Sequence, residues 1–229
     1  MTNGEKPYMT YTRYGGLGAV GQNVGTSGDM EYYENCTTGN YYCEETDPYE
    51  DIDGHQYAMM YDDEECCDNG HRDNILDPYH THVGIGIAYD DYFFIIVQNF
   101  EDNYIDFDER TITRDGEHVI LKGSIPSDTT FSAIQIGYDE TPTSAVYDKN
   151  RDNGFYDSGE IVAGVTDGDS YYDEIETINA DRWLVASNEI DIAFDLEPIL
   201  DKRGVYTIWT VLEDEDGRPF PVTSYSIFS

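Results

Sequence analysis

Runs of apolar residues along the chain predict short β-strands rather than long helices. Residues 82–89 (HVGIGIAY) and 92–100 (YFFIIVQNF) are two such runs, separated by Asp90 and Asp91. β-Branched and aromatic runs joined by a tight acidic turn are typical of a β-hairpin. Because both runs are almost continuously apolar, we expect both faces of this hairpin to be buried.

The second half of the chain predicts a small β-sandwich. Helical periodicity is nearly absent there, and short apolar runs recur every ~8–12 residues, as in sandwich folds. Apolar and polar residues alternate at Ile190, Ile192, Phe194 and Leu196. Strands are therefore expected at 118–125, 131–138, 160–165, 183–186, 189–196, 204–212 and 219–228.

Less regular structure is expected before the hairpin. Residues 1–35 are rich in Gly and Tyr and predict mostly irregular backbone, whereas residues 52–67 (IDGHQYAMMYDDEECC) predict a short helix. A change of pattern near 106–116 marks a boundary, so we expect two domains, 1–108 and 115–229, which is compatible with the chain length.

Charge narrows the range of partners. The 229 residues include 12 Lys and Arg against 48 Asp and Glu, a formal net charge of −36. Such a chain is ill suited to nucleic-acid phosphates and to anionic lipid headgroups, and no apolar run approaches the ~18 residues of a membrane span. The acidic residues are spread over the whole chain, and salt screens their mutual repulsion. We therefore expect a saline setting, either a halophile's cytoplasm or the outside of a marine or halophilic cell.

Cysteine usage favours the outside of the cell. Cys36, Cys43, Cys66 and Cys67 form an even, clustered set in an acidic, loop-rich region, which favours disulfides and an oxidising compartment. We expect cross-links between the 36–43 pair and the 66–67 pair, since a bond between adjacent cysteines closes a strained ring. Pairing within each pair is the alternative. The opening MTNGEKPYM lacks an apolar leader, so we expect either that a leader has been removed or that Met1 is not the natural start.

The most specific segment of the sequence is 69–88 (NGHRDNILDPYHTHVGIGIA), followed by VQNF at 97–100. Upstream stand KPYM and the tetrapeptide GQNV at 21–24. Together they resemble the prokaryotic form of the CAP superfamily (cysteine-rich secretory proteins, antigen 5 and pathogenesis-related 1). In that family a helix runs into GHRxNIL, then a V-G-x-G strand and a strand ending in Q-x-F, with G-E-N-[IV] upstream. The resemblance covers residues 5–105.

The resemblance implies an α-β-α sandwich with a cleft lined by two histidines and two acidic residues. His71 matches one cleft histidine, Gln22 stands where the family usually has Glu, and Glu64 or Asp63 is the candidate second acid. The family's first helix and other histidine have no counterpart, because no His precedes His55. The expected fold is α+β: an incomplete CAP-type α-β-α sandwich followed by an all-β Ig-like sandwich.

The histidines allow more than one interpretation when they are taken as bare residues. His71 could bind a metal, move a proton or cap a helix end. His80 and His82 would share a strand face and could hold Zn²⁺ with His71, or they could simply be a solvated strand start. Gln22 does not titrate, so it cannot act as a base, although it can hydrogen-bond to a ligand or to His71.

Residues 148–160 (DKNRDNGFYDSGE) predict a calcium site. Alternating carboxylate and amide oxygens with a Gly at the turn are what Ca²⁺ requires, although the spacing is one residue longer than in an EF-hand. The loop resembles calcium turns of extracellular β-domains, and the alternative is an ordinary acidic loop. The expected ligands are Asp148, Asn150, Asp152, Asp157 and Glu160, with Asp167 and Asp169 as further candidates.

These features predict a secreted or cell-surface interaction module that binds a lipid, a glycan or a protein, with the β-domain docking it to a surface or neighbour. One alternative is a hydrolase using His71 with a carboxylate, but no Ser or Thr stands in a G-x-S-x-G turn. Another is a subunit of an extracellular assembly, paired through the edge strands of its β-domain. A nucleophile or metal within reach of His71 would distinguish a hydrolase. We expect no metal-dependent enzymatic activity.

Overall fold

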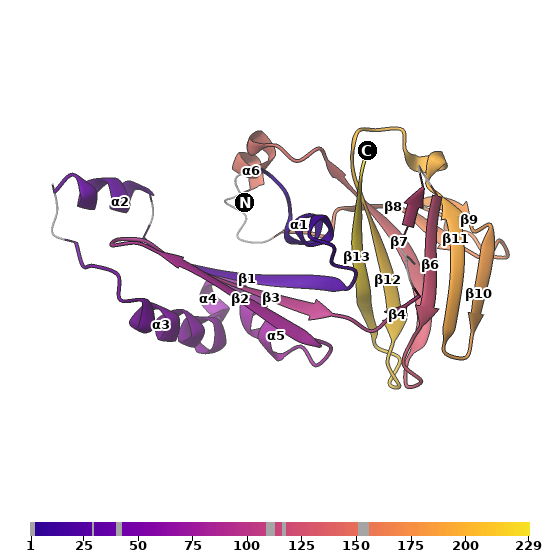
Figure 1. Ribbon diagram of the computed structural model, residues 1–229, viewed down its shortest axis with the longest axis horizontal. Coiled ribbons are helices and arrows are strands. Elements are labelled where there is room, and N and C mark those ends of the chain that lie inside the picture. The colour runs from indigo at the N-terminus through magenta and orange to yellow at the C-terminus, as the bar shows by residue number, and fades with distance from the viewer. Residues whose placement is uncertain (1–2, 29, 40–42, 109–112, 116–117, 151–155) are drawn as a thin grey trace. The chain divides into compact units, whose positions relative to one another are not determined.

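The computed structural model describes residues 3–28, 30–39, 43–108, 113–115, 118–150 and 156–229 (Figure 1). Over these described residues the structure is mixed α+β, with 21% in helices and 44% in strands, and it has three sheets. The chain divides into two compact units. One comprises Met1–Val20 and Asp102–Ser229, here named the β unit, and the other comprises Gly21–Glu101, here named the helix–sheet unit.

The division differs from the expected boundary at 108–115 because the N-terminal residues belong to the β unit. Helix α1 (Pro7–Arg13) carries Tyr8 and Met9, which are buried in one cluster with Val20 and Val205. The Ser226 backbone N–H donates to Thr12 Oγ1 (3.0 Å), which fastens α1 to the C-terminal strand. The expectation that residues 1–35 are mostly irregular was therefore wrong: tertiary burial, with Pro at the first helical turn, orders this segment.

The helix–sheet unit is built on a three-stranded sheet in the order β1-β3-β2. Figure 1 shows α3 and α5 running along this sheet. Phe94 and Ile96 of the sheet form a small core with Met59, and Ile52 and Ile75 pack against it. The elements of this unit are β1 (Ala19–Ser27), α2 (Met30–Thr37), α3 (Pro48–Tyr61), α4 (Glu64–Cys67), α5 (Gly70–Leu76), β2 (His82–Tyr89) and β3 (Phe94–Asp102).

The predicted hairpin is confirmed, but its predicted burial is not. Strands β2 and β3 pair antiparallel from His82↔Glu101 to Tyr89↔Phe94, and Asp90 N–H donates to the Phe93 carbonyl (2.9 Å) across the turn. Buried residues alternate along β3, whereas every residue of β2 is exposed. The reason is position: β2 is the edge strand of the sheet, and the core residues of this unit come from β3 and the helices.

The helix expected at 52–67 forms as two helices, α3 and α4. Helix α3 starts earlier than predicted because the Asp47 side chain caps it, accepting hydrogen bonds from Tyr49 N–H (2.9 Å) and Glu50 N–H (3.3 Å). Helix α4 ends at Asp68, which adopts a left-handed conformation (φ 51°). This break separates α4 from α5, and it determines the geometry of the site described below.

The β unit contains two five-stranded sheets. One has the order β13-β12-β7-β8-β9, and the other has the order β10-β11-β6-β4, with β5 also paired to β6. Phe131 and Trp183 meet edge to face and join the two sheets, with ring centroids 5.4 Å apart. The strands are β4 (Asp106–Phe107), β5 (Thr113–Asp115), β6 (His118–Ser124), β7 (Thr130–Glu140), β8 (Glu160–Thr166), β9 (Glu176–Asn179), β10 (Arg182–Ala186), β11 (Glu189–Asp195), β12 (Gly204–Glu213) and β13 (Pro219–Phe228).

All seven strands predicted for this region are present, and their alternation marks the core. Ile190, Ile192, Phe194 and Leu196 are at most 1% exposed. Because side chains point to opposite sides along a strand, the odd and even positions separate into a buried and an outer set.

Two short helices interrupt the strands, although none was expected in 118–229. Helix α6 (Ser144–Asn150) is capped by Thr143, whose Oγ1 accepts from Val146 N–H (3.2 Å). The 3₁₀ turn Glu197–Ile199 has a Pro in its first turn. Helix α6 therefore depends on a local cap and the 3₁₀ turn on a local proline, rather than on apolar periodicity, which is why the pattern did not indicate them.

The disulfides join Cys36 to Cys43 and Cys66 to Cys67, so the expected cross-links between the pairs were wrong. The Cα atoms of Cys36 and Cys43 are 5.7 Å apart, a normal separation for a bridge. Helix α3, which spans roughly 21 Å at ~1.5 Å per residue, lies along the chain between the two pairs. Figure 1 shows α2 well away from α4.

Among the described residues, no helix is both long enough and apolar enough to cross a bilayer.

Candidate functional site

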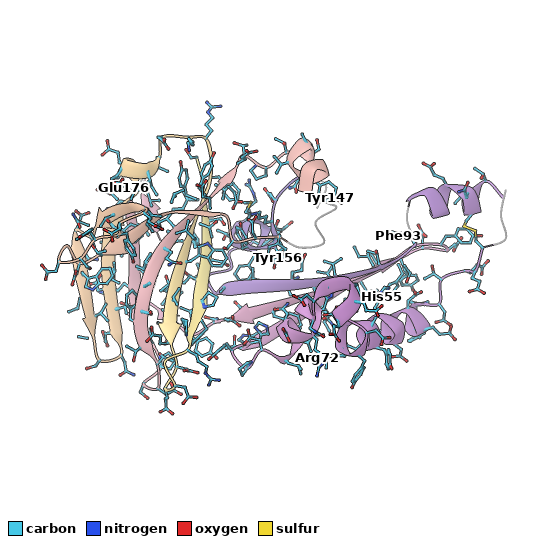
Figure 2. All side chains as sticks on the ribbon, turned by 180° about the vertical axis from the view of Figure 1, so that it is seen from behind. His55, Arg72, Phe93, Tyr147, Tyr156 and Glu176 are labelled. Atoms are coloured by element: carbon cyan, nitrogen blue, oxygen red, sulfur yellow. A yellow bond between two sulfur atoms is a disulfide. The ribbon has the colours of Figure 1, made fainter. Side chains whose placement is uncertain are left out.

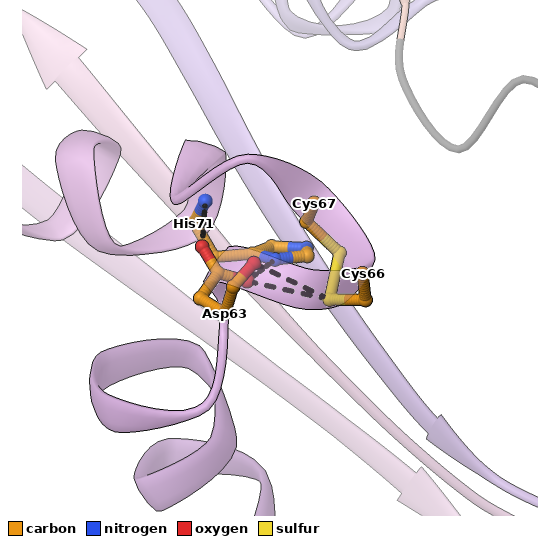
Figure 3. A group of neighbouring side chains, drawn as sticks. All are labelled: Asp63, Cys66, Cys67 and His71. Atoms are coloured by element: carbon orange, nitrogen blue, oxygen red, sulfur yellow. Dashed lines mark hydrogen bonds and ion pairs between the residues drawn. A yellow bond between two sulfur atoms is a disulfide. The ribbon is translucent and has the colours of Figure 1, made fainter.

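A buried carboxylate holds His71 in a fixed orientation (Figure 3). Asp63 is 2% exposed, and its Oδ1 lies 2.6 Å from His71 Nδ1. Its Oδ2 accepts the backbone N–H groups of His71 (2.8 Å) and Arg72 (3.0 Å). An ionised carboxylate accepts only, so Nδ1 carries the hydrogen, and in the neutral imidazole Nε2 then keeps a lone pair. Within the described parts of the chain, Nε2 has no hydrogen-bond partner.

The turn between α4 and α5 creates this geometry. Asp68 (φ 51°) and Asn69 (φ 63°) are both left-handed, a conformation that Asp and Asn adopt more readily than most residues. Backbone N–H groups of Cys67 (3.0 Å) and Asn69 (3.3 Å) donate to the Asp63 carbonyl and close the turn. The chain is thereby reversed so that the first N–H groups of α5 point at the Asp63 carboxylate.

Hydrogen bonding keeps Asp63 ionised despite its burial. Burial by itself would raise the pKa of this carboxyl. The hydrogen bonds from His71 and Arg72 outweigh that effect and hold the pKa of Asp63 below its usual value. The carboxylate is therefore charged at neutral pH and serves as a fixed acceptor for His71.

Buried amides tie the backbone of His71 to the sheet. Asn23 of β1 donates through Nδ2 to the His71 carbonyl (2.9 Å) and accepts at Oδ1 from Asn74 Nδ2 (2.9 Å). Gln98 of β3 donates to Gln56 Oε1 (2.8 Å). Sequence reasoning missed this network. A signal was present in β3, since Gln98 interrupts an apolar run and Gln is unusual at such a position, but β1 offered none.

A glycine leaves room for this network. A Cβ at Gly21 would lie 2.7 Å from Asn74 Oδ1, an impossible contact unless Asn74 moves. Moving Asn74 would break its hydrogen bond to Asn23. The Gly of the GQNV segment is therefore needed for packing at this position.

Of the four residues predicted for the cleft, the structure brings together Asp63 and His71. Gln22 Nε2 donates to Asn99 Oδ1 (2.7 Å), and adjacent residues on β1 point to opposite faces of the sheet. Asn23, not Gln22, therefore contacts the His71 segment. Glu64 is exposed at the start of α4, so Asp63 is the one of the two acidic candidates that meets His71.

The group around His71 is poorly suited to holding a metal. Ligand atoms of Asp63, Cys66, Cys67 and His71 lie within 4.8 Å of one another. Both sulfurs belong to a disulfide, however, and metals bind the thiolate form of cysteine. Asp63 and His71 Nδ1 remain, and each already satisfies the other.

His80 and His82 have partners elsewhere. The His80 ring stacks on Phe100 (centroids 4.8 Å apart), and its Nε2 lies 3.3 Å from Asn74 Oδ1. His82 Nδ1 lies 3.4 Å from Glu101 Oε2. The described residues therefore do not gather His71, His80 and His82 into a three-histidine zinc site.

A serine beside a histidine occurs at the end of β1, but its geometry is not that of a nucleophile with its base. Ser27 Oγ lies 2.5 Å from Asp51 Oδ1 and 2.9 Å from His55 Nε2. The ring of His55, which is labelled in Figure 2, stacks on Phe94. A hydroxyl has one hydrogen, and the short contact to Asp51 takes it. His55 then donates to Ser27, so it cannot accept the serine proton as a general base requires.

The predicted calcium loop lies only partly within the described residues. Asp157 forms an ion pair with Lys6 and accepts from Gly159 N–H (2.9 Å), and the Lys6 hydrogen bond holds the pKa of Asp157 below its usual value. Glu160 begins β8 and is exposed. Of the two further candidates, Asp167 accepts from Asp169 N–H (3.0 Å). Asp152 lies outside the described residues, and so do the side chains of Asp148 and Asn150, whose backbone ends α6.

A second histidine–carboxylate group lies on the β unit. His118 Nδ1 is 2.8 Å from Asp195 Oδ1 and 3.9 Å from Asp181 Oδ2. The register of β6 with β11 places His118 opposite Asp195, 77 residues away in sequence. No local pattern could reveal this pairing. The two aspartates are exposed, so the group is a solvated histidine–carboxylate contact rather than an enclosed site.

Comparison with known proteins gives no match, either to a family model or to a curated protein.

Proposed function

We propose that the chain is an extracellular binding module of the CAP type, in which His71 of the helix–sheet unit contacts the ligand. The β unit docks the module to a cell surface or to a neighbouring protein. The observation that carries the proposal is the Asp63–His71 pair: a buried carboxylate fixes the imidazole and leaves the Nε2 lone pair without a partner among the described residues. The His71 side chain is 23% exposed, so a ligand can reach it.

Binding is favoured over hydrolysis because the described residues place no nucleophile beside His71. Gln22 does not titrate, and the serine that does touch a histidine, Ser27, is bonded to Asp51. Hydrolysis needs a nucleophile or an activated water within hydrogen-bond reach of a base. His71 fixed by Asp63 can accept a hydrogen bond without any such step.

The chemistry of the site favours a neutral or cationic ligand that donates hydrogen bonds. Nε2 is an acceptor, and a net charge of −36 repels anions. Hydroxyl groups of a neutral glycan meet both conditions. Of the ligand classes predicted from the sequence, we therefore propose a glycan as the first to test, ahead of a lipid or a protein.

Extracellular location is proposed from the cysteines. Two disulfides bridge the four cysteines of the chain, and disulfides persist in oxidising compartments. The distributed negative charge suits a saline medium, where salt screens its self-repulsion.

Nitrogen-detected NMR of the histidine side chains tests the binding proposal. The probes are maltohexaose, cellohexaose and chitohexaose, and the expected result is a shift of His71 Nε2 with at least one of them, while His118 is unchanged. Replacing Asp63→Asn should weaken that response, because the imidazole loses its fixed orientation. No shift with any of the three sugars would contradict glycan binding at His71. Cleavage of a probe by the wild type, but not by His71→Ala, would establish the hydrolase instead.

Zinc calorimetry tests whether the site is a metal centre. A Zn²⁺ site that performs chemistry takes three protein ligands, and Asp63 with His71 supplies two. We expect no Zn²⁺ binding tighter than micromolar that depends on His71. Such binding, lost in His71→Ala, would contradict the proposal.

We also propose that residues 148–160 bind Ca²⁺, on the strength of their alternating oxygen ligands. Calcium that binds only the folded loop raises the melting temperature by mass action. Replacing Asp148→Ala together with Asp152→Ala should remove that rise. The exposed Asp128→Ala is the matched control and should retain it. No shift at millimolar Ca²⁺ would favour the acidic-loop alternative.

A further inference from the structure

The edge strand β2 is unusually open. It pairs with β3 on one side, and no described strand pairs with its other side. All eight of its residues are exposed, so its outward N–H and C=O groups are accessible. An edge of this kind is a template for pairing with another strand.

β2 also lacks the features that normally protect an edge. Residues 83–89 contain no charged residue and no proline, in a chain with 48 acidic residues, and the β2–β3 register has no bulge. The edge strand β10 is different, because it has five residues and carries Arg182 paired to Asp191. We expected assembly through edge strands of the β-domain. By these criteria β2 of the helix–sheet unit is better suited to pairing with another strand than β10 is.

The apolar side chains of β2 form a stripe on one side. Val83, Ile85, Ile87 and Tyr89 are 57%, 61%, 44% and 60% exposed. Alternate residues share a face, and opposite residues in a ladder do too, so this stripe continues the row of buried β3 side chains that includes Phe94. The positions between them hold Gly and Ala, which leave the other side flat.

We propose that β2 pairs antiparallel with β2 of a second copy of the chain, in a register centred on Gly86, to give a continuous six-stranded sheet. This register places Ile85 opposite Ile87 of the other copy and Val83 opposite Tyr89 of the other copy. At both ends of the paired strands His82 lies opposite Asp90 of the other copy, so that a hydrogen-bond donor can meet a carboxylate. The middle of the paired strands carries no charged residue. A twofold axis through Gly86 makes the interface self-complementary.

We infer that the strand pairing with β2 comes from a second copy of the chain, because β2 itself has the charge pattern that such a strand requires. A partner strand must be extended, apolar on one side and uncharged at its centre, and must end in an acceptor opposite His82. β2 followed by Asp90 meets each of these conditions. The remaining surface of each copy is strongly acidic, so contacts outside this strand oppose association.

The dimer is favoured by apolar contacts and opposed by charge repulsion, so its stability should depend on the salt concentration. Repulsion between two chains of net charge −36 is long-ranged and is screened as the Debye length falls from ~10 Å at about 0.1 M salt to ~3 Å at about 1 M. The apolar contacts of the stripe are not screened. Dimerisation should therefore strengthen with salt, whereas an interface held by salt bridges would weaken.

Sedimentation velocity on the full chain tests the proposal in about 0.1 M and about 1 M NaCl. We expect the dimer dissociation constant to fall by about tenfold or more at high salt. Ile85→Lys should leave a monomer at both concentrations. The matched control is Val24→Lys, an exposed apolar residue (40%) on β1 of the same sheet, which should dimerise like the wild type. Circular dichroism of each variant verifies folding.

A mixing experiment tests the register. Ile87→Glu alone should also be monomeric, but mixing it with Ile85→Lys should restore a heterodimer, because Gly86-centred pairing puts the two new side chains opposite each other. The proposal is overturned by a wild type that is monomeric at high salt, by a dimer that Ile85→Lys leaves intact, or by equal loss in Val24→Lys. Failure of the two variants to associate, with wild-type dimers present, overturns the register.

Discussion

The two units bury different chemistry. In the β unit the core is mainly apolar, with Ile134, Ile136 and Phe194 fully buried. Its fully buried polar side chains are neutral hydroxyls, as in Thr207 and Thr223. In the helix–sheet unit a small apolar core lies beside Asn23, Asp63 and Gln98, which are 2%, 2% and 5% exposed. An apolar interior is stabilised by burial and tolerates changes that conserve volume. A polar interior is stable only while every buried group keeps its partner, so it is specific but vulnerable.

In the β unit, charged groups meet close beneath the surface beside Tyr8 of α1. Lys6 lies 2.6 Å from Asp139, which also accepts from Tyr8 OH (2.6 Å). Burial, followed by the negative charge of Asp139, raises the pKa of Tyr8 far above its usual value. Tyr8 is thus neutral at any working pH, and its hydroxyl donates to Asp139, which helps to hold α1 in place. Asp63 differs from Tyr8, because the Asp63 carboxylate can be protonated in acid.

Phe194→Ala should give the largest effect and should be confined to the β unit. Truncating a fully buried Phe costs roughly 3–5 kcal/mol of unfolding free energy. Both tryptophans, Trp183 and Trp209, lie in this unit, so fluorescence-detected urea unfolding measures it selectively. Tyr171→Ala, at a side chain 78% exposed, should change little. Equal loss of amide protection in residues 21–101 would show that the units do not unfold separately.

Asp63→Asn should destabilise the helix–sheet unit by roughly 2–3 kcal/mol, because hydrogen bonds to a buried charge are lost and an amide N–H₂ meets backbone N–H groups. Hydrogen exchange should accelerate in 21–27 and 64–76, while tryptophan fluorescence of the β unit is unchanged. Asp62→Asn, at the exposed neighbour, is the control. Unchanged exchange in Asp63→Asn would mean that the buried carboxylate is dispensable.

The two disulfides should differ in their effect on stability. Replacing Cys36 and Cys43 by Ser opens a short loop and should cost about 2 kcal/mol, because the unfolded chain gains conformational freedom. Replacing Cys66 and Cys67 by Ser removes a bridge between neighbours and should cost well under about 1 kcal/mol, since that bridge closes no chain loop. Thermal unfolding followed by circular dichroism compares them. A larger loss for the adjacent pair would contradict the loop-entropy argument.

The smallest effect is a pH dependence specific to the helix–sheet unit. The pKa of Asp63 is lower in the folded protein than its unfolded value of about 3.9. Its contribution to stability is therefore complete above the unfolded pKa and is lost as the pH falls through the folded pKa. Amide protection in 64–76 should decline over this acid range in the wild type. In Asp63→Asn the part of this loss of amide protection that is due to Asp63 should be absent. If wild type and Asp63→Asn lose protection identically as the pH falls, Asp63 does not cause the loss.

Local patterns predicted most of the strands, although not β1, β4, β5 or β9, because the order of apolar and polar residues along a segment indicates a strand. Ile190, Ile192 and Phe194 are an example of alternation, whereas the hairpin at 82–100 was predicted from two continuous apolar runs and the acidic turn between them. The exposure of β2 could not be predicted in the same way. Whether an apolar strand is central or at an edge depends on which other segments pair with it, and that is tertiary information.

The site was predictable only in part, for the same reason. His71 and Asp63 were identified from a motif, and they are eight residues apart. Asn23, rather than Gln22, contacts the His71 segment because its side chain lies on the face of β1 that meets the helices. The sequence of β1 alone does not specify which of its two faces that is. The contact of Ser224 N–H with the Gly18 carbonyl (3.1 Å), which places residues 1–20 in the β unit, joins residues 206 positions apart.

The close approach at Gly21 has a consequence for the order in which mutations can accumulate. Any side chain at Gly21 collides with Asn74 Oδ1 as long as Asn74 is present. Asn74→Ala removes the collision but also the hydrogen bond to Asn23. Gly21→Ala should therefore be harmful in the wild-type background and nearly neutral after Asn74→Ala. The two sites are epistatic. A lineage that has lost Asn74 can replace Gly21 by a larger residue, and after that a reversion to Asn74 would recreate the collision.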